Sequence, residues 1–293
     1  MLLKKRSLTL VIYLTLIGVF TSLSLILILP VNYSYYALSN GSSGHRELLD
    51  YSVTWTTSTR SLRDLDATKL VLVTARSTPV SSGDFEELVE FTSRGGVVVA
   101  YGSREYVESI LRNLGFEVTF WGLLRDPVFS ESSPERVLVE LVEWNTTIIL
   151  DTPYVLNVTD TPSIGELVYT ANTSVFSFVD VNENNTYDLG EPIGEFPVVY
   201  TVRIGSGVIV VVCAHGVFTN SVLRENTAWL NHLASGDRSV VLDQSEFRSN
   251  LLAYLKLLVF TPRGVSPLFI LIVSLVVVVV LYYVYLGEGY RQL

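Results

Sequence analysis

A run of oxygen-bearing side chains between Asp180 and Glu191 has the spacing of a calcium-binding loop. Side-chain oxygens recur at its first, third, fifth, ninth and twelfth positions, and a main-chain carbonyl is available at the seventh, which is the EF-hand register. In such a loop alternate residues point inward, and the final carboxylate binds the ion through both oxygens. We therefore predict a structural calcium ion held by Asp180, Asn182, Asn184, Thr186, Asp188 and Glu191.

This loop departs from the EF-hand pattern in two respects. Asn185 stands where glycine is usual, although asparagine tolerates the left-handed backbone conformation better than most residues. The flanking segments Val175–Val179 and Phe196–Tyr200 have the composition of strands rather than helices. We expect a calcium loop between two strands; the alternative is a polar turn that binds no metal.

The sequence offers little for nucleophilic catalysis. Its single cysteine, Cys213, ends an apolar run and lacks a Gly-x-Cys-x-Gly turn, although His215 follows two residues later. A thiol nucleophile needs a base and an orienting group that converge on it, so a small buried side chain is the expected role of Cys213. His45, His215 and His232 do not have the spacing of zinc ligands. We predict no catalytic residues and therefore no enzymatic activity.

The elements that must position these groups alternate between strands and helices. Leu70–Thr74 and Val97–Tyr101 are apolar runs typical of strands buried on both faces. Ser81–Arg94 and Ser103–Leu114 have helical spacing, and Ser81 or Ser82 can cap the first of these helices. This alternation predicts an α/β fold with a parallel sheet flanked by helices. Short β-like runs over 121–200 indicate a β-rich insertion.

A ligand crevice is expected at the carboxyl ends of the parallel strands, where open α/β sheets bind their ligands. The segments Ala75–Thr78, Gly102–Arg104 and Ala214–Phe218 follow predicted strands. Polar side chains in these segments are the candidates for ligand contacts, namely Ser77, Ser103, Arg104 and His215.

Two long stretches without charge flank this region and predict membrane spans at 8–29 and 266–286. A bilayer core of roughly 30 Å requires about 20 apolar residues in a helix. Because basic residues cluster at 4–6, the positive-inside rule predicts cytoplasmic tails at 1–7 and 287–293 and an extracytoplasmic domain over 30–262. The alternative for the first stretch is a cleaved signal peptide.

The charge of the chain limits its partners. The formal net charge is −9, and because 4–6 are basic, about −12 falls between the two apolar stretches. Such a field repels nucleic acid, so we expect no nucleic-acid partner. N-glycosylation triplets in the predicted extracytoplasmic segment agree with its placement and start at Asn32, Asn40, Asn145, Asn157, Asn172 and Asn184.

Several motifs resemble a membrane-anchored family of unknown function from archaea and bacteria. They are the loop Asn40–Gly44, the runs Leu70–Thr74 and Val97–Gly102, the run Gly205–Asn220, and the pair Glu225 and Asn226 with the later Val241–Asp243. The resemblance implies a flavodoxin-like domain related to the class I glutamine amidotransferases. It also implies non-catalytic components of envelope or transport-related assemblies.

We therefore expect a non-catalytic, membrane-anchored binding or scaffold protein of the cell envelope. Membrane lipid and other envelope or transporter membrane proteins would be its partners. Two alternatives are a solute-binding accessory subunit of a transporter and a carbohydrate-active hydrolase that uses carboxylates. A crevice lined with acids and aromatic side chains would favour the hydrolase.

Overall fold

The structure is a computed structural model. It describes residues 29–51, 53–159, 161–261 and 264–267, together with 17–18, 21–22, 24, 269–271, 273–275, 278 and 282. The chain divides into two compact units, one of Asn32–Arg248 and one of Met1–Val31 with Ser249–Leu293. The larger unit holds every candidate site residue.

The main sheet of the larger unit has seven strands in the order β1-β12-β2-β3-β10-β9-β7. The first five are parallel, whereas β9 runs antiparallel to both β10 and β7. Apolar β-branched residues fill the buried positions of the central strands, which makes these strands the core. The strands are β1 (Thr54–Thr56), β2 (Leu70–Arg76), β3 (Val97–Gly102), β7 (Glu166–Asn172), β9 (Pro197–Ile204), β10 (Gly207–Val212) and β12 (Ser239–Asp243).

A second, antiparallel sheet is built mostly from the predicted insertion. Its order is β11-β6-β4-β8, and β5 also pairs with β6. The long strand β6 therefore has three partners along its length. The strands are β4 (Glu117–Arg125), β5 (Arg136–Leu141), β6 (Thr146–Thr159), β8 (Phe178–Asp180) and β11 (Ala214–Gly216).

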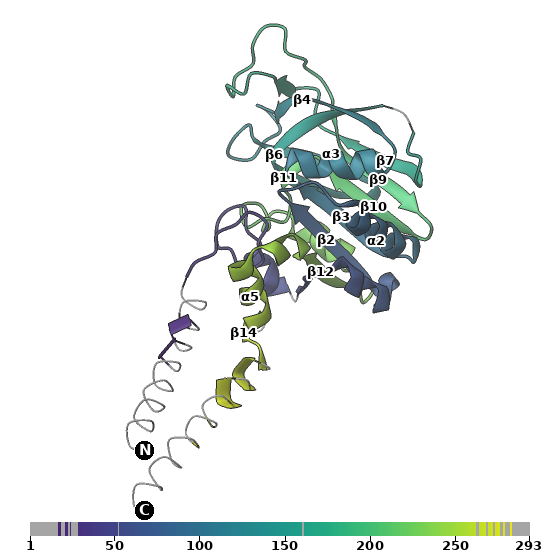
Figure 1. Ribbon diagram of the computed structural model, residues 1–293. Helices are drawn as coiled ribbons and strands as arrows, with labels where there is room; N and C mark the ends of the chain where they lie inside the picture. Colours follow the sequence, from purple (N-terminus) through teal and green to yellow (C-terminus); the bar gives the residue numbers. More distant parts are fainter. Residues whose placement is uncertain are drawn as a thin grey trace, which may run out of the picture. The chain divides into compact units, whose positions relative to one another are not determined.

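Helices cover the main sheet, and two of them begin at serine caps. Ser81 accepts a hydrogen bond from the Asp84 amide at the start of α2 (Ser82–Ser93), and Ser103 does the same for the Tyr106 amide at α3 (Arg104–Asn113). Both helices pack on β3 and β10 (Figure 1). The remaining helices of this unit are α4 (Thr227–Leu233) and the 3-10 turns η1 (Glu47–Tyr51), η2 (Thr59–Asp64), η3 (Ala67–Lys69), η4 (Val142–Trp144) and η5 (Ser245–Ser249).

The predicted fold class is wrong in its sheet and in its membrane helices. A parallel sheet flanked by helices accounts for only part of the domain, because β7, β9 and the whole second sheet are antiparallel. Part of the physical reason is the tight turn at Gly205, which folds the chain back on itself and pairs β9 antiparallel with β10; the pairing of β7 and of the second sheet involves other segments. The result is a mixed α/β fold with two substantial sheets.

The predicted two-pass membrane topology is also corrected. Within the part of the chain that the structure describes, no helix combines the length and the apolar character needed to cross a bilayer. A span requires a continuous helix of about 20 residues, and an uncharged apolar run does not by itself provide one. The placement of 30–262 outside the cytoplasm depended on that topology. Most of 8–29 and 266–286, and all of 1–7 and 287–293, lie outside the described residues.

The smaller unit contains one described helix of regular length. This helix, α5 (Leu251–Val259), is capped by the Asn250 side chain, and Lys256 donates a hydrogen bond to the Leu29 carbonyl. It is followed by the two short strands β13 (Phe260–Thr261) and β14 (Gly264–Val265).

Candidate functional site

A buried ion pair organises the carboxyl edge of the parallel strands. Arg76, at the end of β2, places Nη2 2.6 Å from Oδ2 of Asp243, at the end of β12. Asp243 also accepts from Thr74, and Arg76 reaches Asp84 at 3.0 Å. Burial alone would lower the pKa of Arg76, but Asp243 raises it overall above its ordinary value. The pair therefore stays charged and joins two strands that are far apart in sequence.

The predicted crevice residues lie at this same edge but do not form one cluster. Ser77, Ser103 and Arg104 follow β2 and β3, whereas His215 lies on β11. The Ser103 hydroxyl donates to the Ser77 carbonyl at 3.0 Å, so these two loops are in contact. The Arg104 guanidinium lies 4.5 Å from the centre of the Phe120 ring, which directs it toward β4.

His215 lies in an aromatic and acidic environment. Its Nδ1 is 3.4 Å from the Tyr35 hydroxyl, and its ring packs edge-on against Tyr154. Tyr154 in turn donates to the Gly102 carbonyl, which connects His215 to the end of β3. Burial lowers the pKa of His215, although Asp151 opposes the shift. This histidine is therefore largely neutral at pH 7.

A second histidine lies close by but is fully buried. His45 has one ring nitrogen 2.9 Å from the Tyr35 carbonyl and the other 2.5 Å from the Tyr101 hydroxyl. Burial lowers the pKa of His45 to about 4. Both ring nitrogens have partners, so His45 acts as a polar connection within the core.

Cys213 is fully buried at the end of β10. Its amide donates to the Val198 carbonyl, and its carbonyl accepts from the Tyr154 amide. Burial raises the pKa of the thiol well above its ordinary value. Because the thiolate is the reactive form, the surroundings of Cys213 disfavour nucleophilic chemistry.

The predicted calcium residues form a closed loop between β8 and β9. Asp180, which is fully buried, accepts hydrogen bonds from the amides of Asn184 and Asn185. Both oxygens of Glu191 accept main-chain amides, at Val181 and Asp188. The loop is thus folded around its first and last carboxylates.

The side chains within this loop converge on Asp188. Its Oδ2 is 2.6 Å from Nδ2 of Asn182 and 2.7 Å from Nδ2 of Asn184. A cation would require these amides to turn their oxygens inward, and the oxygens would then give up the hydrogen bonds that they accept from the Asn184 and Thr186 amides. Asn185 has a φ of 64°, as expected at the position where EF-hands carry glycine. The donor set fits calcium in register, although the described residues contain no group of three or more His, Cys, Asp or Glu side chains that could hold a metal.

Sequence reasoning missed Arg125, the residue that anchors this loop to the second sheet. The guanidinium is buried, donates twice to Oδ1 of Asn185 at 2.9 and 2.7 Å, and lies 3.6 Å from Asp180. Arg125 ends β4, next to β8 in the sheet, so only knowledge of the strand order could have revealed it.

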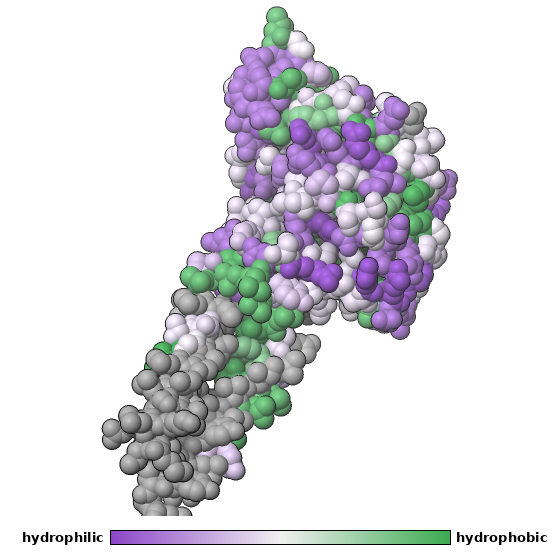
Figure 2. All heavy atoms as spheres, viewed as in Figure 1, coloured by the Kyte–Doolittle hydropathy of each residue, from purple (hydrophilic) through white to green (hydrophobic). Residues whose placement is uncertain are grey.

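An aromatic face lies on two neighbouring loops of the insertion. The rings of Phe129 and Phe176 stack with centroids 6.1 Å apart, yet the two residues are 48% and 51% exposed. Val128 and Val175 beside them are also exposed, and these four residues make up what we call the aromatic face. Figure 2 shows apolar residues exposed among polar ones over this β-rich end of the domain.

The asparagines quoted in the sequence motifs have structural roles. Asn226 is fully buried and binds three main-chain groups, the amide and carbonyl of Ile149 and the carbonyl of Val217. Asn220 donates to the carbonyls of Ser39 and Gly41. These bonds hold the Asn40–Gly44 loop against the chain that follows β11.

Residues 34–234 match a family described as a domain of unknown function, DUF4350. The chain belongs to the DUF4350 family. The matched residues include every strand of the two large sheets except β12, which lies beyond residue 234. They also contain the asparagine contacts just described. No curated protein matches this DUF4350 chain.

Solved structures are similar to this DUF4350 protein only at a distance. The mmIFT52 N-terminal domain has a TM-score of 0.41 and 16% identity, with 61% of this chain and 82% of that domain covered. A putative ThuA-like protein from Bacteroides uniformis has a TM-score of 0.32 and 12% identity, covering 62% and 74%. The exo-β-1,4-mannosidase Op5Man5 from Opitutaceae bacterium strain TAV5 has a TM-score of 0.30 and 10% identity, covering 66% and 25%. Likenesses at these values identify neither a function nor a ligand.

Proposed function

We propose that this DUF4350 protein is a non-catalytic binding or scaffold protein that recognises a protein partner through its aromatic face. The observation that supports this proposal is the stacked, half-exposed pair of Phe129 and Phe176. Exposed aromatic groups that gather at one place are typical of protein-binding surfaces, where a few such residues supply most of the binding energy.

The aromatic face is supported from below. Asp126 is fully buried, and its carboxylate accepts from the Val128 and Phe129 amides and from the Ser174 and Ser177 hydroxyls. One carboxylate therefore fixes both loops that carry the aromatic rings. A surface that is ordered before binding loses less conformational entropy when a partner docks.

The test is affinity purification after crosslinking in native cells, comparing wild type with Phe129→Ser/Phe176→Ser. We expect the double variant to lose its specific partner by roughly tenfold or more, because hot-spot truncations typically exceed 2 kcal/mol. Val142→Ser is the matched control, since Val142 is 68% exposed but lies on η4. Equal recovery by all three proteins would refute the proposed face.

We also propose that calcium binds the Asp180–Glu191 loop in a structural role. The register of oxygen donors and the left-handed conformation at Asn185 support this proposal. A calcium ion would offset the repulsion among the three carboxylates of the proposed ligand set, Asp180, Asp188 and Glu191, and would add to the positive charge that Arg125 already places beside Asp180.

Calcium is expected to raise the melting temperature of the protein, because an ion that binds the folded loop stabilises it by mass action. Loops of this kind in extracellular modules bind with dissociation constants of about 10⁻⁴–10⁻³ M, so titration to about 10 mM covers the range. Asp188→Asn/Glu191→Gln should remove the calcium-dependent shift, whereas Glu183→Gln, whose position contributes no ligand, should retain it. A melting temperature that calcium and chelator leave unchanged would show that the loop is only a polar turn.

A further inference from the structure

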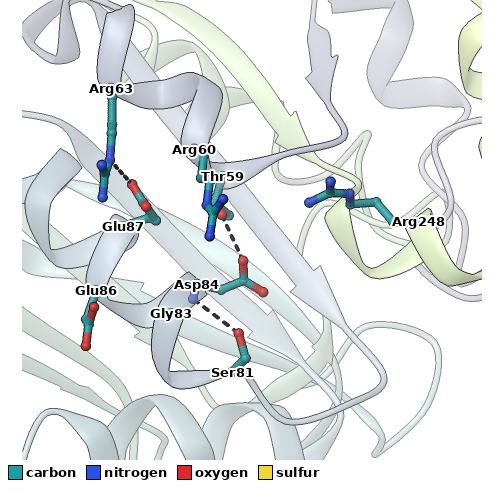
Figure 3. A pocket seen from close by; sticks show the side chains of 9 residues that line it. All are labelled: Thr59, Arg60, Arg63, Ser81, Gly83, Asp84, Glu86, Glu87 and Arg248. Atoms are coloured by element: carbon teal, nitrogen blue, oxygen red, sulfur yellow. Dashed lines mark hydrogen bonds and ion pairs between the residues drawn. The ribbon is translucent and has the colours of Figure 1, made fainter.

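A hollow of about 490 Å³ lies at the carboxyl ends of the parallel strands, apart from the predicted crevice residues. Three elements surround it, each directly after a strand: η2 after β1, η5 after β12, and the start of α2 after β2 (Figure 3). Its volume falls within the range of small-molecule sites, roughly 300–1,000 Å³. Its lining is polar or charged throughout, consisting of Thr59, Arg60, Arg63, Ser81, Gly83, Asp84, Glu86, Glu87 and Arg248.

The acidic groups of the hollow are mostly neutralised within the protein. Glu87 lies 2.7 Å from Arg63, and Asp84 lies 3.0 Å from Arg76 behind the hollow. Burial works against ionisation of Asp84, but hydrogen bonds from Thr59 and Arg76 hold its pKa below the ordinary value. Glu86 points away from the arginines in Figure 3.

Two cations in the hollow have no counter-charge in the part of the chain that the structure describes. Among the described residues, neither Arg60 nor Arg248 forms an ion pair or a side-chain hydrogen bond, and both are exposed. They come from η2 and η5, which are nearly 200 positions apart in the chain, and their side chains extend toward the same space as the first turn of α2 (Figure 3). Two unpaired guanidinium groups that share one hollow are notable in a chain of formal charge −9.

We propose that this hollow binds a small hydrophilic molecule through a phosphate or sulfate group held by Arg60 and Arg248. The planar fork of a guanidinium matches the oxygens of such a group and can bind two of them at once. The first turn of α2, a helix of twelve residues, adds main-chain amides and a favourable dipole on the same side. Because no aromatic or aliphatic side chain among the described residues lines the hollow, the rest of the ligand is expected to be polar, as in a sugar ester, rather than a nucleoside.

The test is calorimetric titration of the full chain with pyrophosphate, inorganic phosphate and sulfate at low ionic strength. We expect saturable binding that weakens as salt is raised, since exposed charges are screened. Arg60→Gln and Arg248→Gln should each weaken the affinity by about tenfold, the usual effect of losing a charged hydrogen bond. Whether the phosphates or sulfate bind more tightly identifies the group that the hollow takes.

Two further measurements separate loss of the site from loss of the fold. Arg203→Gln removes an exposed arginine on β9 that does not line the hollow, and it should bind as wild type does. All three variants should melt at the wild-type temperature without ligand, because none of these three arginines forms an ion pair or a side-chain hydrogen bond with a residue that the structure describes. Absence of saturable binding by all three anions, or binding that Arg60→Gln and Arg248→Gln leave unchanged, would overturn the proposal. This inference is independent of the aromatic face, which lies on the insertion.

Discussion

Replacement of Asp243 by asparagine is expected to lower the free energy of unfolding by roughly 3–5 kcal/mol, the usual cost of leaving a buried charge unpaired. Asp243 is fully buried, and its Oδ2 accepts from Arg76 and Thr74. The amide keeps the shape of the carboxylate but removes the charge that balances Arg76. Unfolding in urea, followed by circular dichroism, measures the loss.

The control for this prediction is Thr74→Val, which removes a neutral hydroxyl that donates to the same carboxylate and is also hydrogen-bonded to the buried Tyr106 hydroxyl. Its expected cost is about 2 kcal/mol, because the Tyr106 hydroxyl also loses a partner. If Asp243→Asn costs no more than Thr74→Val, then Asp84, the second partner of Arg76, is sufficient to hold the guanidinium, and the ion pair to Asp243 is not what joins β2 to β12.

Asn226→Ala is expected to destabilise the domain by roughly 3 kcal/mol or more. The substitution leaves three buried main-chain groups without partners, and each unsatisfied group costs about 1–3 kcal/mol. These groups belong to Ile149 on β6 and to Val217 after β11, so the loss falls where the second sheet meets α4. Thermal unfolding and hydrogen exchange at the β6 amides would both report it.

Asn113→Ala provides the comparison for Asn226. Asn113 also donates from Nδ2 to a main-chain carbonyl, that of Ser109 in the last turns of α3. This hydrogen bond is only partly buried, so water can replace it more easily. We expect a loss below about 1 kcal/mol there. Similar losses for the two alanine variants would mean that water replaces the Asn226 contacts.

Local elements could be predicted from the sequence because their signals are local. The buried runs that became β2 and β3, and the helical runs that became α2 and α3, depend on residues within a few turns or one strand of each other. The extent of the antiparallel pairing could not be predicted in this way. Strand β6 pairs with β4, β5 and β11, and nothing in its own alternation specifies three partners.

The polar contacts between distant segments were beyond prediction for the same reason. The sequence motifs around Asn220, Asn226 and Asp243 were visible as patterns, but each has a partner at least 77 positions away, namely Gly41, Ile149 and Arg76. The charged hollow was missed because Arg60 and Arg248 belong to 3-10 turns, which leave no periodic signal. Its location at the carboxyl ends of the strands is nevertheless the place where α/β sheets bind ligands.

The position of β12 between β1 and β2 has a consequence for the growing chain on the ribosome. β1 and β2 are made early and are not neighbours in the sheet; β12, made about 170 residues later, pairs in parallel with both. Until that last strand emerges, the edge of β2 has no partner, and Gln244 is not yet present to hold the Tyr35 and Ala37 main chain. A nascent chain that stops before Ser239 therefore presents an open apolar strand edge, the kind of surface that chaperones bind and that promotes aggregation.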